Sequence, residues 1–379
     1  MQAGKKSQRP SKLKIGVLYG GRSGEHDVSL CSAASVVAAL DKKKYDVVAI
    51  GIDRDGRWYV QDRPEIVADK DFGNILSLRK RGIWLVNHFE EQNKLYIYNL
   101  EKSGEKVVVD LVFPVLHGTY GEDGTLQGLL ELAMVPYVGV DVAGAAVGMD
   151  KDIAKRLLTE AGIPVVPWIT VSKSQWLGQS KKILRDALTN LALPLFVKPL
   201  CTGSSVGVVK VKLKKDLACA VDYALQFDTR VMIETGIDCR EIECAVLGNE
   251  NPQASVLGEI LPRHEFYSYE AKYLDPKGAS MNIPAKIPAR FASAIRKCAV
   301  AGYAALNCNS MARVDFFLDK KTGAFYLNEI NTLPGFTAIS MYPKLWDATG
   351  IPYSKLLDRL IDLAQDRHRQ KLAVKTDGI

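Results

Sequence analysis

Short apolar runs alternate with amphipathic stretches along the first part of the chain. Residues 14–19 are apolar and end at Gly20-Gly21, which is typical of a buried parallel strand that enters a tight turn. An Ala-, Val- and Leu-rich helix and a second apolar run complete a strand–helix–strand unit. The pattern predicts strands at 14–19, 45–53, 110–116 and 137–140 and helices at 28–40 and 125–134. We therefore expect an N-terminal doubly wound α/β domain over residues 13–149.

The rest of the chain mixes both periodicities, as α+β units do. The pattern predicts helices at 150–161, 215–226, 288–306 and 353–373, and strands at 165–171, 195–199, 206–211 and 231–233. The first of these helices stops at Gly162, a common residue just after a helix end. The last carries a predicted buried stripe formed by Leu356, Leu357, Leu360, Ile361 and Ala364. We expect two further units, at 150–240 and 241–379, packed closely together.

Residues 54–108 have weak periodicity. A hairpin turn at Asp55-Gly56 is the one feature that the sequence predicts there.

A hairpin near the C-terminus gathers oxygen-bearing side chains. Apolar strands at 313–318 and 325–330 are joined by a Lys-Thr-Gly turn. Glu329 and Asn331 are two positions apart and share a strand face, and pairing would bring Asp315 alongside them. Carboxylate and amide oxygens are the ligands that Mg²⁺ prefers, with phosphates and waters completing the shell. A solvated hairpin with scattered acids is the alternative.

Composition excludes several classes of protein. With 379 residues, 47% hydrophobic and 25% charged, the chain is long enough for two or three globular domains. The net charge is +7, but five basic residues lie in the first fourteen positions. The remainder is close to neutral, so we expect no nucleic-acid partner.

Cysteine usage and hydropathy indicate the compartment. The seven cysteines are scattered and form no C-x-x-C pair, which favours reduced thiols and a cytoplasmic protein. Residues 1–12 are polar, so we expect a disordered basic tail and no signal peptide. The most apolar long window, residues 128–149, is interrupted by charged residues and proline, so we expect no membrane span.

Two glycine-containing loops are candidate ligand sites. Residues 20–26 follow the first strand, but their glycines do not match the G-x-G-x-x-G dinucleotide fingerprint. That loop places Glu25 at the carboxyl edge of the sheet, where the acid could pair with a substrate ammonium or lie exposed in a turn. Residues 202–207 are small and rich in hydrogen-bond donors, which suits a loop over phosphates. Lys151 and Lys198 flank it and suit α- and β-phosphates, unless they are surface lysines.

Three further features carry weaker signals. Backbone groups beside Glu234 suit an adenine edge, and Glu241 suits a ribose diol. His117 follows a strand, where a structural and an active-site role are equally compatible with the sequence. Residues 265–274 are aromatic and flanked by proline and glycine, which favours an omega-type loop at 263–280 over a buried strand.

Eight segments together resemble the D-alanine–D-alanine ligases of the ATP-grasp superfamily. In chain order they read GGRSGEHDVS, HGTYGEDGTLQG, MDKDIAKRLL, VKPLCTGSSVG, REIECAVLGN, YEAKYL, ARVDFFLD and NEINTLPGFTAIS. The resemblance spans residues 14–364 and implies an ATP-grasp fold. Cys201-Thr202 and Thr235 depart from residues that are common in the family. Adenine contacts there are largely main-chain, so neither departure affects the assignment.

The resemblance also implies chemistry. It implies ATP-driven joining of two D-alanines through an acyl phosphate, for peptidoglycan precursor synthesis, with two Mg²⁺ ions and Mn²⁺ as a possible substitute. It assigns catalytic roles to Glu25, Ser204, Tyr273, Arg313 and Gly335, substrate binding to His117 and Ser340, ATP binding to Lys151, Lys198, Glu234, Ile237, Glu241 and Lys272, and metal binding to Asp315, Glu329 and Asn331. Ser204 and Tyr273 are expected to hydrogen-bond with Glu25. The implied assembly is a homodimer, with neither nucleic acid nor membrane as partner.

Three other functions stay open from the sequence. A related ligase could join a different acid and amine. The first glycine loop leaves room for a dinucleotide-dependent oxidoreductase. A catalytically silent nucleotide-binding regulator is the third, although the complete set of Arg313, Asp315, Glu329 and Asn331 argues against it.

Overall fold

A computed structural model describes residues 12–87, 93–262, 279–337 and 339–375. The predicted basic tail, apart from its last residue, and almost all of the predicted omega-type loop lie outside these ranges, and Lys272 and Tyr273 lie there with the loop. Within the described part of the chain, no helix is both long enough and apolar enough to cross a membrane.

The N-terminal sheet is the doubly wound unit that the sequence predicts. Its strand order is β3-β2-β1-β9, with β1 parallel to β2 and β9 and with β3 antiparallel at the edge. The strands are β1 (Leu13–Gly20), β2 (Tyr45–Ile52), β3 (Trp58–Val60) and β9 (Leu111–Pro114), and the helices are α1 (His26–Ala39) and α2 (Thr125–Leu132). The predicted turn at Asp55-Gly56 joins β2 to β3, which confirms it.

The predicted strand at 137–140 is wrong. Tyr137 makes one isolated parallel bridge to Val112, where Val112 N donates to Pro136 O and Val138 N donates to Val112 O. Gly139 then takes a φ of +101°, which turns the chain away from the sheet before a ladder can form. The weakly periodic stretch at 54–108 forms small antiparallel sheets from β4 (Ile66–Asp69), β5 (Gly73–Leu76), β6 (Trp84–Asn87), β7 (Leu95–Asn99) and β8 (Lys106–Val109).

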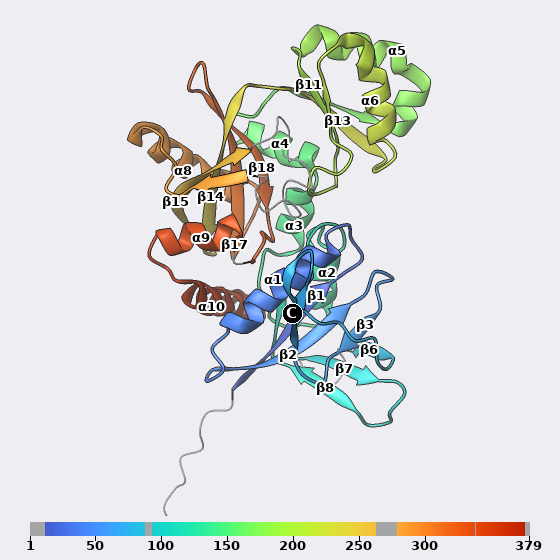
Figure 1. Cartoon of the computed structure of the whole chain (residues 1–379), viewed down its shortest axis with the longest axis vertical. Coiled ribbons are helices and arrows are strands. Elements are labelled where there is room, and N and C mark those ends of the chain that lie inside the picture. Colours follow the sequence, from blue (N-terminus) through green and yellow to red (C-terminus); the bar gives the residue numbers. More distant parts are fainter. Residues whose placement is uncertain (1–11, 88–92, 263–278, 338, 376–379) are drawn as a thin grey trace, which may run out of the picture.

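A central antiparallel sheet has the order β10-β13-β11-β12 and is covered by two helices (Figure 1). The strands are β10 (Trp168–Ser172), β11 (Leu195–Pro199), β12 (Val209–Val211) and β13 (Arg230–Thr235), and the helices are α5 (Lys173–Asn190) and α6 (Leu217–Ala224). Helix α5 was not predicted. Only two of its residues, Trp176 and Ala187, are buried, and non-helical backbone at Gln179 interrupts it. Its start does carry a signal, since Ser172 and Gln175 form a capping box.

The predicted hairpin lies in a second antiparallel sheet with the order β16-β15-β14-β17-β18. Its elements are β14 (Cys239–Leu247), β15 (Gln253–Pro262), β16 (Ala279–Asn282), β17 (Met311–Asp319) and β18 (Phe325–Asn331), with α8 (Ala289–Ala305), α9 (Met341–Ala348) and α10 (Tyr353–Leu372). Strands β17 and β18 confirm the hairpin. Helix α9 was not predicted. Helices α3 (Val142–Met149) and α4 (Lys151–Glu160) connect the N-terminal sheet to the central unit (Figure 1).

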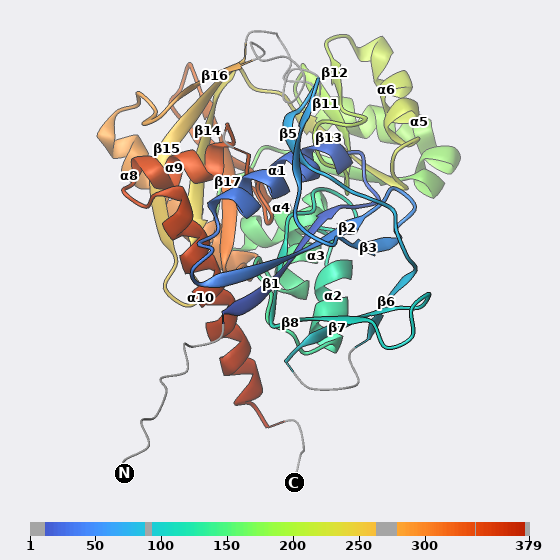
Figure 2. The same ribbon diagram turned by 60° about the horizontal axis from the view of Figure 1, so that its bottom comes forward.

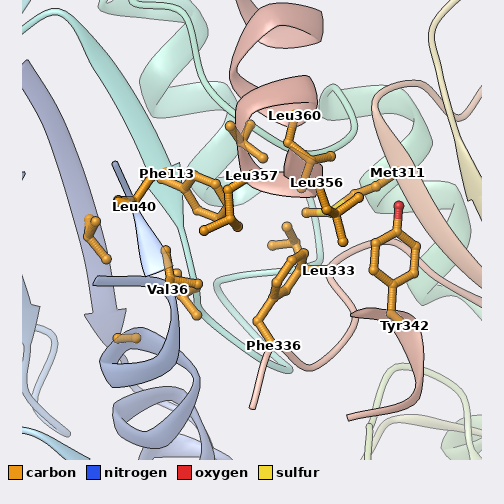
Figure 3. Close-up of a cluster of buried hydrophobic side chains, with 14 of the residues drawn as sticks. Val36, Leu40, Phe113, Met311, Leu333, Phe336, Tyr342, Leu356, Leu357 and Leu360 are labelled. Atoms are coloured by element: carbon orange, nitrogen blue, oxygen red, sulfur yellow. The ribbon is translucent and has the colours of Figure 1, made fainter. Parts of the chain in front are cut away.

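A shared core joins the two ends of the chain. Helix α10 packs against α1 and β9, and the buried side chains of all three meet the loop that follows β18 (Figures 2 and 3). Leu356, Leu357 and Leu360 are at most 1% exposed, which confirms the predicted stripe. Phe336 from the loop stacks edge-on to Phe113 of β9, with ring centroids 6.1 Å apart. Apolar packing therefore joins the N-terminal sheet to the end of the β17–β18 hairpin.

A buried arginine on α10 reinforces this junction. The guanidinium of Arg367 lies 4.5 Å from the centroid of the Tyr137 ring, donates to Tyr137 O at 2.8 Å, and also contacts Gly139 O and Asn309 Oδ1. One cation thus satisfies acceptors from the N-terminal domain and from the turn before β17.

Replacing Arg367 should destabilise the whole fold. In Arg367→Met three buried oxygen acceptors lose their donor, and we expect the free energy of unfolding to fall by about 3 kcal/mol. The matched control is Arg369→Met, because Arg369 is exposed and its ion pair is with Asp366 on the same helix. Urea unfolding of both variants measures the difference, and equal stabilities would contradict the role given to Arg367.

Candidate functional site

The predicted site residues lie between the central sheet, the C-terminal sheet and the N-terminal domain. The ammonium of Lys198 on β11 is 5.9 Å from the ring of Phe196 on its own strand and 5.9 Å from the ring of Phe317 on β17. The two antiparallel sheets therefore face each other across this lysine.

The hairpin brings the predicted metal ligands together. Asp315 pairs with Glu329 across β17 and β18, and Arg313 pairs with Asn331. The Asn331 amide nitrogen donates to Asp315 Oδ2 at 3.0 Å. Directly paired residues of an antiparallel ladder place their side chains on the same face, so all three oxygen-bearing groups share one end of the hairpin.

Arg313 binds the acids of this site. Its guanidinium donates to both carboxylate oxygens of Asp315, at 2.8 and 2.7 Å, and lies 3.0 Å from Glu243 Oε2. Burial opposes the charge on Arg313, but Asp315 and Glu243 outweigh burial and raise its pKa. Arg313 is therefore a permanent cation beside the predicted metal ligands.

These ligands suit a hard cation that arrives with its own oxygens. Among the residues that the structure describes, no group of three or more His, Cys, Asp or Glu side chains could hold a metal by itself. Two carboxylates and one amide oxygen leave several octahedral positions for phosphate and water, as Mg²⁺ in nucleotide sites requires. The hairpin thus fits a metal–phosphate complex, in which Asp315 would turn from Arg313 toward the ion.

Two predicted phosphate ligands are partly buried lysines with different partners. Lys151 is the first residue of α4, and its ammonium donates to Leu200 O at 3.2 Å and to Thr202 O at 2.7 Å. Burial lowers the pKa of Lys151, and the nearby charge of Glu329 opposes this. Lys198 forms an ion pair with Glu234.

Glu234 holds two lysines at once. Its second carboxylate oxygen accepts from Lys155 on α4 at 2.7 Å, and Lys155 also donates to Val166 O at 3.2 Å. Burial alone would raise the pKa of Glu234, but Lys198 and Lys155 lower it to about 2. Both oxygens of this carboxylate are therefore paired with lysines, and the adenine contact beside it stays a prediction. Ile237 lies in the connection from β13 to β14, and Glu241 lies on β14.

Glu25 occupies the N-cap position of α1 and is buried. It accepts a hydrogen bond from the Ser204 hydroxyl of the glycine-rich loop, as predicted for this pair. Glycines enclose the carboxylate, since a Cβ added at Gly118 or Gly203 would lie 2.8 or 2.7 Å from Glu25 Oε2. The second predicted partner, Tyr273, lies outside the described residues.

His117 holds the loop after β18. Its Nδ1 is 3.2 Å from Leu333 O and its Nε2 is 3.1 Å from Ser32 Oγ. Burial lowers the pKa of His117, and the charge of Glu25 opposes this. With Nδ1 donating to Leu333, Nε2 accepts from Ser32, whose oxygen in turn accepts from Phe336 N at 3.4 Å. His117 lies beside Glu25, but protein groups occupy both ring nitrogens.

The same loop carries the remaining predicted residues. Ser340 Oγ accepts from Thr337 N at 3.0 Å and lies 2.7 Å from Thr337 Oγ1. A Cβ added at Gly335 would lie 2.9 Å from Ser340 Oγ, so glycine lets the loop close tightly there. Gly335 and Ser340 are thus adjacent at the end of the hairpin, near His117.

Four further residues of the site were not predicted from the sequence. They are Ser32, Glu122, Lys155 and Glu243. Some had local signals: Lys155 lies four positions after Lys151 and therefore on the same helix face, and Ser32 lies seven after Glu25 on α1. No local signal marks Glu243, because its position opposite Asp315 depends on the pairing of β14 with β17.

Glu122 is an acid with an unusual environment. Its carboxylate accepts from Gly118 N at 2.6 Å and from Leu333 N at 3.3 Å, so it joins the N-terminal domain to the loop after β18. Burial raises the pKa of Glu122 from 4.5 to about 8, and Glu25 adds to the effect. The folded protein therefore holds this proton more tightly than the unfolded chain does.

That raised pKa predicts a pH dependence of stability. The contribution is complete below the ordinary value of 4.5 and is lost as pH rises through about 8. We expect the free energy of unfolding to fall across this interval, and Glu122→Gln to remove part of the slope. Urea unfolding at about pH 5 and about pH 8 tests this. The exposed control Glu250→Gln should keep the parent slope, and equal slopes in all three proteins would refute it.

Two family models match the chain. The model described as "D-ala D-ala ligase N-terminus" covers residues 14–140, and the model described as "D-ala D-ala ligase C-terminus" covers residues 157–362. Together they contain all of the predicted site residues except Lys151, which lies between them.

Relatives and solved structures agree with the models. A protein of Bradyrhizobium diazoefficiens named D-alanine–D-alanine ligase A is 48% identical over 367 residues, covering 96% of this chain and 98% of its own. The protein of the same name from Escherichia coli K12 is 46% identical over 365 residues, covering 96% and 99%.

The D-alanine-D-alanine ligase structure from Coxiella burnetii matches with a TM-score of 0.75 at 38% identity, covering 95% of this chain and 96% of its own. The VanG D-Ala:D-Ser ligase of Enterococcus faecalis matches with a TM-score of 0.77 at 35% identity, covering 93% and 100%. These likenesses extend along nearly the whole length of each protein. The chain therefore belongs to the D-alanine–D-alanine ligase family, with its ATP-grasp fold.

Proposed function

We propose that this protein is an ATP-dependent ligase that joins two D-alanines into D-alanyl-D-alanine, for peptidoglycan precursor synthesis. One observation carries the proposal: an acid suited to an ammonium, Glu25, lies in the same cluster as Arg313 and the hairpin ligands. The charges of Glu25 and Arg313 both shift the pKa values of His117 and Glu122, which supports a short separation between Glu25 and Arg313. An amino acid held by Glu25 would present its carboxylate toward Arg313 and the phosphates.

The nucleotide side of the site supports phosphoryl transfer. Lys151 and Lys198 supply positive charge for the α- and β-phosphates, with Ile237 and Glu241 toward the nucleoside. When bound, Mg²⁺ would neutralise β- and γ-phosphate oxygens from its place on Asp315, Glu329 and Asn331. Lys272 is assigned to the γ-phosphate, a role that the described residues leave as a prediction.

The reaction needs two displacements. A carboxylate oxygen of the first D-alanine attacks the γ-phosphorus, the bond to the bridging oxygen breaks, and ADP leaves as an acyl phosphate forms. The amine of the second D-alanine, having lost a proton, then attacks the acyl carbon. Phosphate leaves and the amide forms.

Arg313 and the Gly335 amide would bind the carbonyl oxygen as negative charge develops on it, the action of an oxyanion hole. Ser340, beside Gly335, would bind the carboxylate of the second substrate. Tyr273, as an uncharged hydroxyl linked through Ser204 to Glu25, would accept a hydrogen bond from the attacking amine.

A second acceptor is the main rival. The match to a D-Ala:D-Ser ligase keeps D-serine as a candidate for the second substrate. A dinucleotide-dependent oxidoreductase finds no support, since the loop at residues 20–26 encloses Glu25 and lacks the fingerprint spacing. A silent regulator is disfavoured by the paired Arg313 and Asp315.

A competition assay tests the proposal. The purified protein with ATP, Mg²⁺ and D-alanine should release phosphate and form D-alanyl-D-alanine, identified by mass. With equal D-alanine, D-serine and D-lactate at about pH 7, we expect D-alanine to exceed each other acceptor by at least about tenfold, or 1.4 kcal/mol. A yield of the D-serine dipeptide or of the D-lactate ester comparable to that of D-alanyl-D-alanine would contradict D-alanine as the second substrate. If no acceptor leads to phosphate release, the proposed ligase activity is refuted.

Replacing Glu329 should abolish catalysis but spare the fold. Glu329→Gln removes a charge on which the metal–phosphate complex depends, and we expect kcat/KM to fall by more than about a hundredfold, or about 3 kcal/mol. The exposed control Glu250→Gln should match the parent enzyme. Steady-state kinetics at ordinary Mg²⁺, with thermal unfolding of each variant, decide the matter; near-normal turnover would exclude Glu329 from the site.

Several expectations stay predictions. They are the use of two Mg²⁺ ions, their replacement by Mn²⁺, the homodimer, the cytoplasmic location and the unit boundaries at residues 149 and 240.

A further inference from the structure

The glycine-rich loop at residues 200–207 touches both substrate sites of the proposed ligase. At its start, the carbonyls of Leu200 and Thr202 accept from Lys151, the proposed phosphate ligand. At its tip, the Ser204 hydroxyl donates to Glu25, the proposed ammonium ligand. Ser204 and Ser205 hold φ values of +49° and +60°, a conformation that neighbouring contacts must support. The placement of the tip thus depends on how the start of the loop is held.

Asp228 holds the start of the loop from one side. Its Oδ2 accepts from Cys201 N at 2.8 Å, and its Oδ1 accepts from Arg230 N at 3.2 Å. Leu200 N also donates to Arg230 O at 3.2 Å. Both oxygens of this half-buried carboxylate therefore bind backbone N–H groups, one on the loop and one on β13.

Asp150 holds the same structure from the other side. Its Oδ1 caps α4 by accepting from Asp152 N and Ile153 N, each at 3.0 Å. Its Oδ2 binds the Arg230 guanidinium. Asp150 is 6% exposed and directly precedes Lys151. The Asp150 carboxylate thus links α4, which carries the proposed phosphate ligand Lys151, to β13, which binds the start of the loop.

We propose that Asp150, Asp228 and Arg230 are positioning residues that couple the nucleotide and first-amino-acid sites through the loop at residues 200–207. The inference rests on the proposed function. An ammonium has three N–H donors, so Lys151 can bind a phosphate while it still donates to Leu200 O and Thr202 O. A bound nucleotide would thus fix the start of the loop, and with it the Ser204 hydroxyl against Glu25. Occupancy of one site therefore tightens the other, and the coupling is reciprocal.

A purely local role for these residues makes a different prediction. If Asp150 served only as a helix cap, then Asn, which caps equally well through its own oxygen, would be silent. In Asp150→Asn the cap oxygen remains, but the group facing Arg230 becomes an uncharged donor. The substitution therefore separates the cap from the ion pair.

The test measures binding and turnover on the full-length protein. Calorimetry gives the affinity for D-alanine with and without a non-hydrolysable ATP analogue and Mg²⁺. In the parent protein we expect the analogue to tighten D-alanine binding by roughly tenfold, and in Asp150→Asn by less than about twofold. The KM values for ATP and for the first D-alanine should both rise by about tenfold, with kcat changed less.

Two further variants separate loss of coupling from misfolding and from loss of a helix cap. Asp228→Asn leaves one of its two backbone N–H partners facing an amide NH₂, and it should lose the same coupling. Asp141→Asn is the matched control, since Asp141 caps the neighbouring helix α3 through Gly144 N at 3.1 Å. That control should keep both KM values and the coupling. Thermal unfolding verifies that each variant folds.

A double variant tests the path itself. If Asp150 acts through the loop tip, then adding Ser204→Ala to Asp150→Asn should weaken coupling no further than the stronger single change does. Full additivity would overturn the inference. So would an uncoupled parent protein, or near-parental coupling in both Asp150→Asn and Asp228→Asn. A parent protein that couples the two ligands but forms no dipeptide would instead refute the proposed function and leave the inference standing.

Discussion

Burying several charges close together is possible only when each has a counter-charge, and this constraint shapes the site. Arg313 lies between Asp315 and Glu243, and Glu234 lies between Lys155 and Lys198. An unpaired charge at such a depth would cost several kcal/mol. The protein without substrates therefore satisfies its charges internally. In the proposed complex, phosphates, metal and ammonium would take the place of some of these partners, so that binding would exchange ion pairs.

The site is assembled from parts that belong to different sheets, and the fold must hold them in register. His117 and Glu122, from the loop after β9, bind the carbonyl and the N–H of Leu333, and Ser32 of α1 binds the N–H of Phe336, three residues further along the same segment. Underneath, Leu333 and Phe336 pack in the core shared with α10 (Figure 3). Polar contacts on one side of this loop and apolar packing on the other place Gly335 next to Ser340. The terminal helix thus supports the site without contributing a proposed ligand.

Local patterns were informative wherever local physics decides the structure. Alternating and continuous apolar runs predicted β1, β2, β11 and the β17–β18 hairpin, because burial of one face imposes its period on the sequence. The pattern failed where tertiary contacts or polar surfaces dominate. Helix α5 is interrupted by non-helical backbone at Gln179, and only Trp176 and Ala187 are buried on it. The segment at 137–140 has the composition of a strand, but Gly139 turns it away after a single bridge.

The sequence by itself determined the chemistry that is available: two carboxylates and an amide on one hairpin, lysines around a glycine-rich loop, and an acid after the first strand. Spacing of two along a strand and pairing through a short turn are local rules, so the proposed metal-binding set could be inferred without a fold. Only the tertiary structure decided which charges meet. Glu243 opposes Asp315, Lys155 reaches Glu234, and Glu122 reaches Leu333. Those pairs join segments tens to hundreds of positions apart, and no local period records them, because burial of charge is a property of the packed molecule.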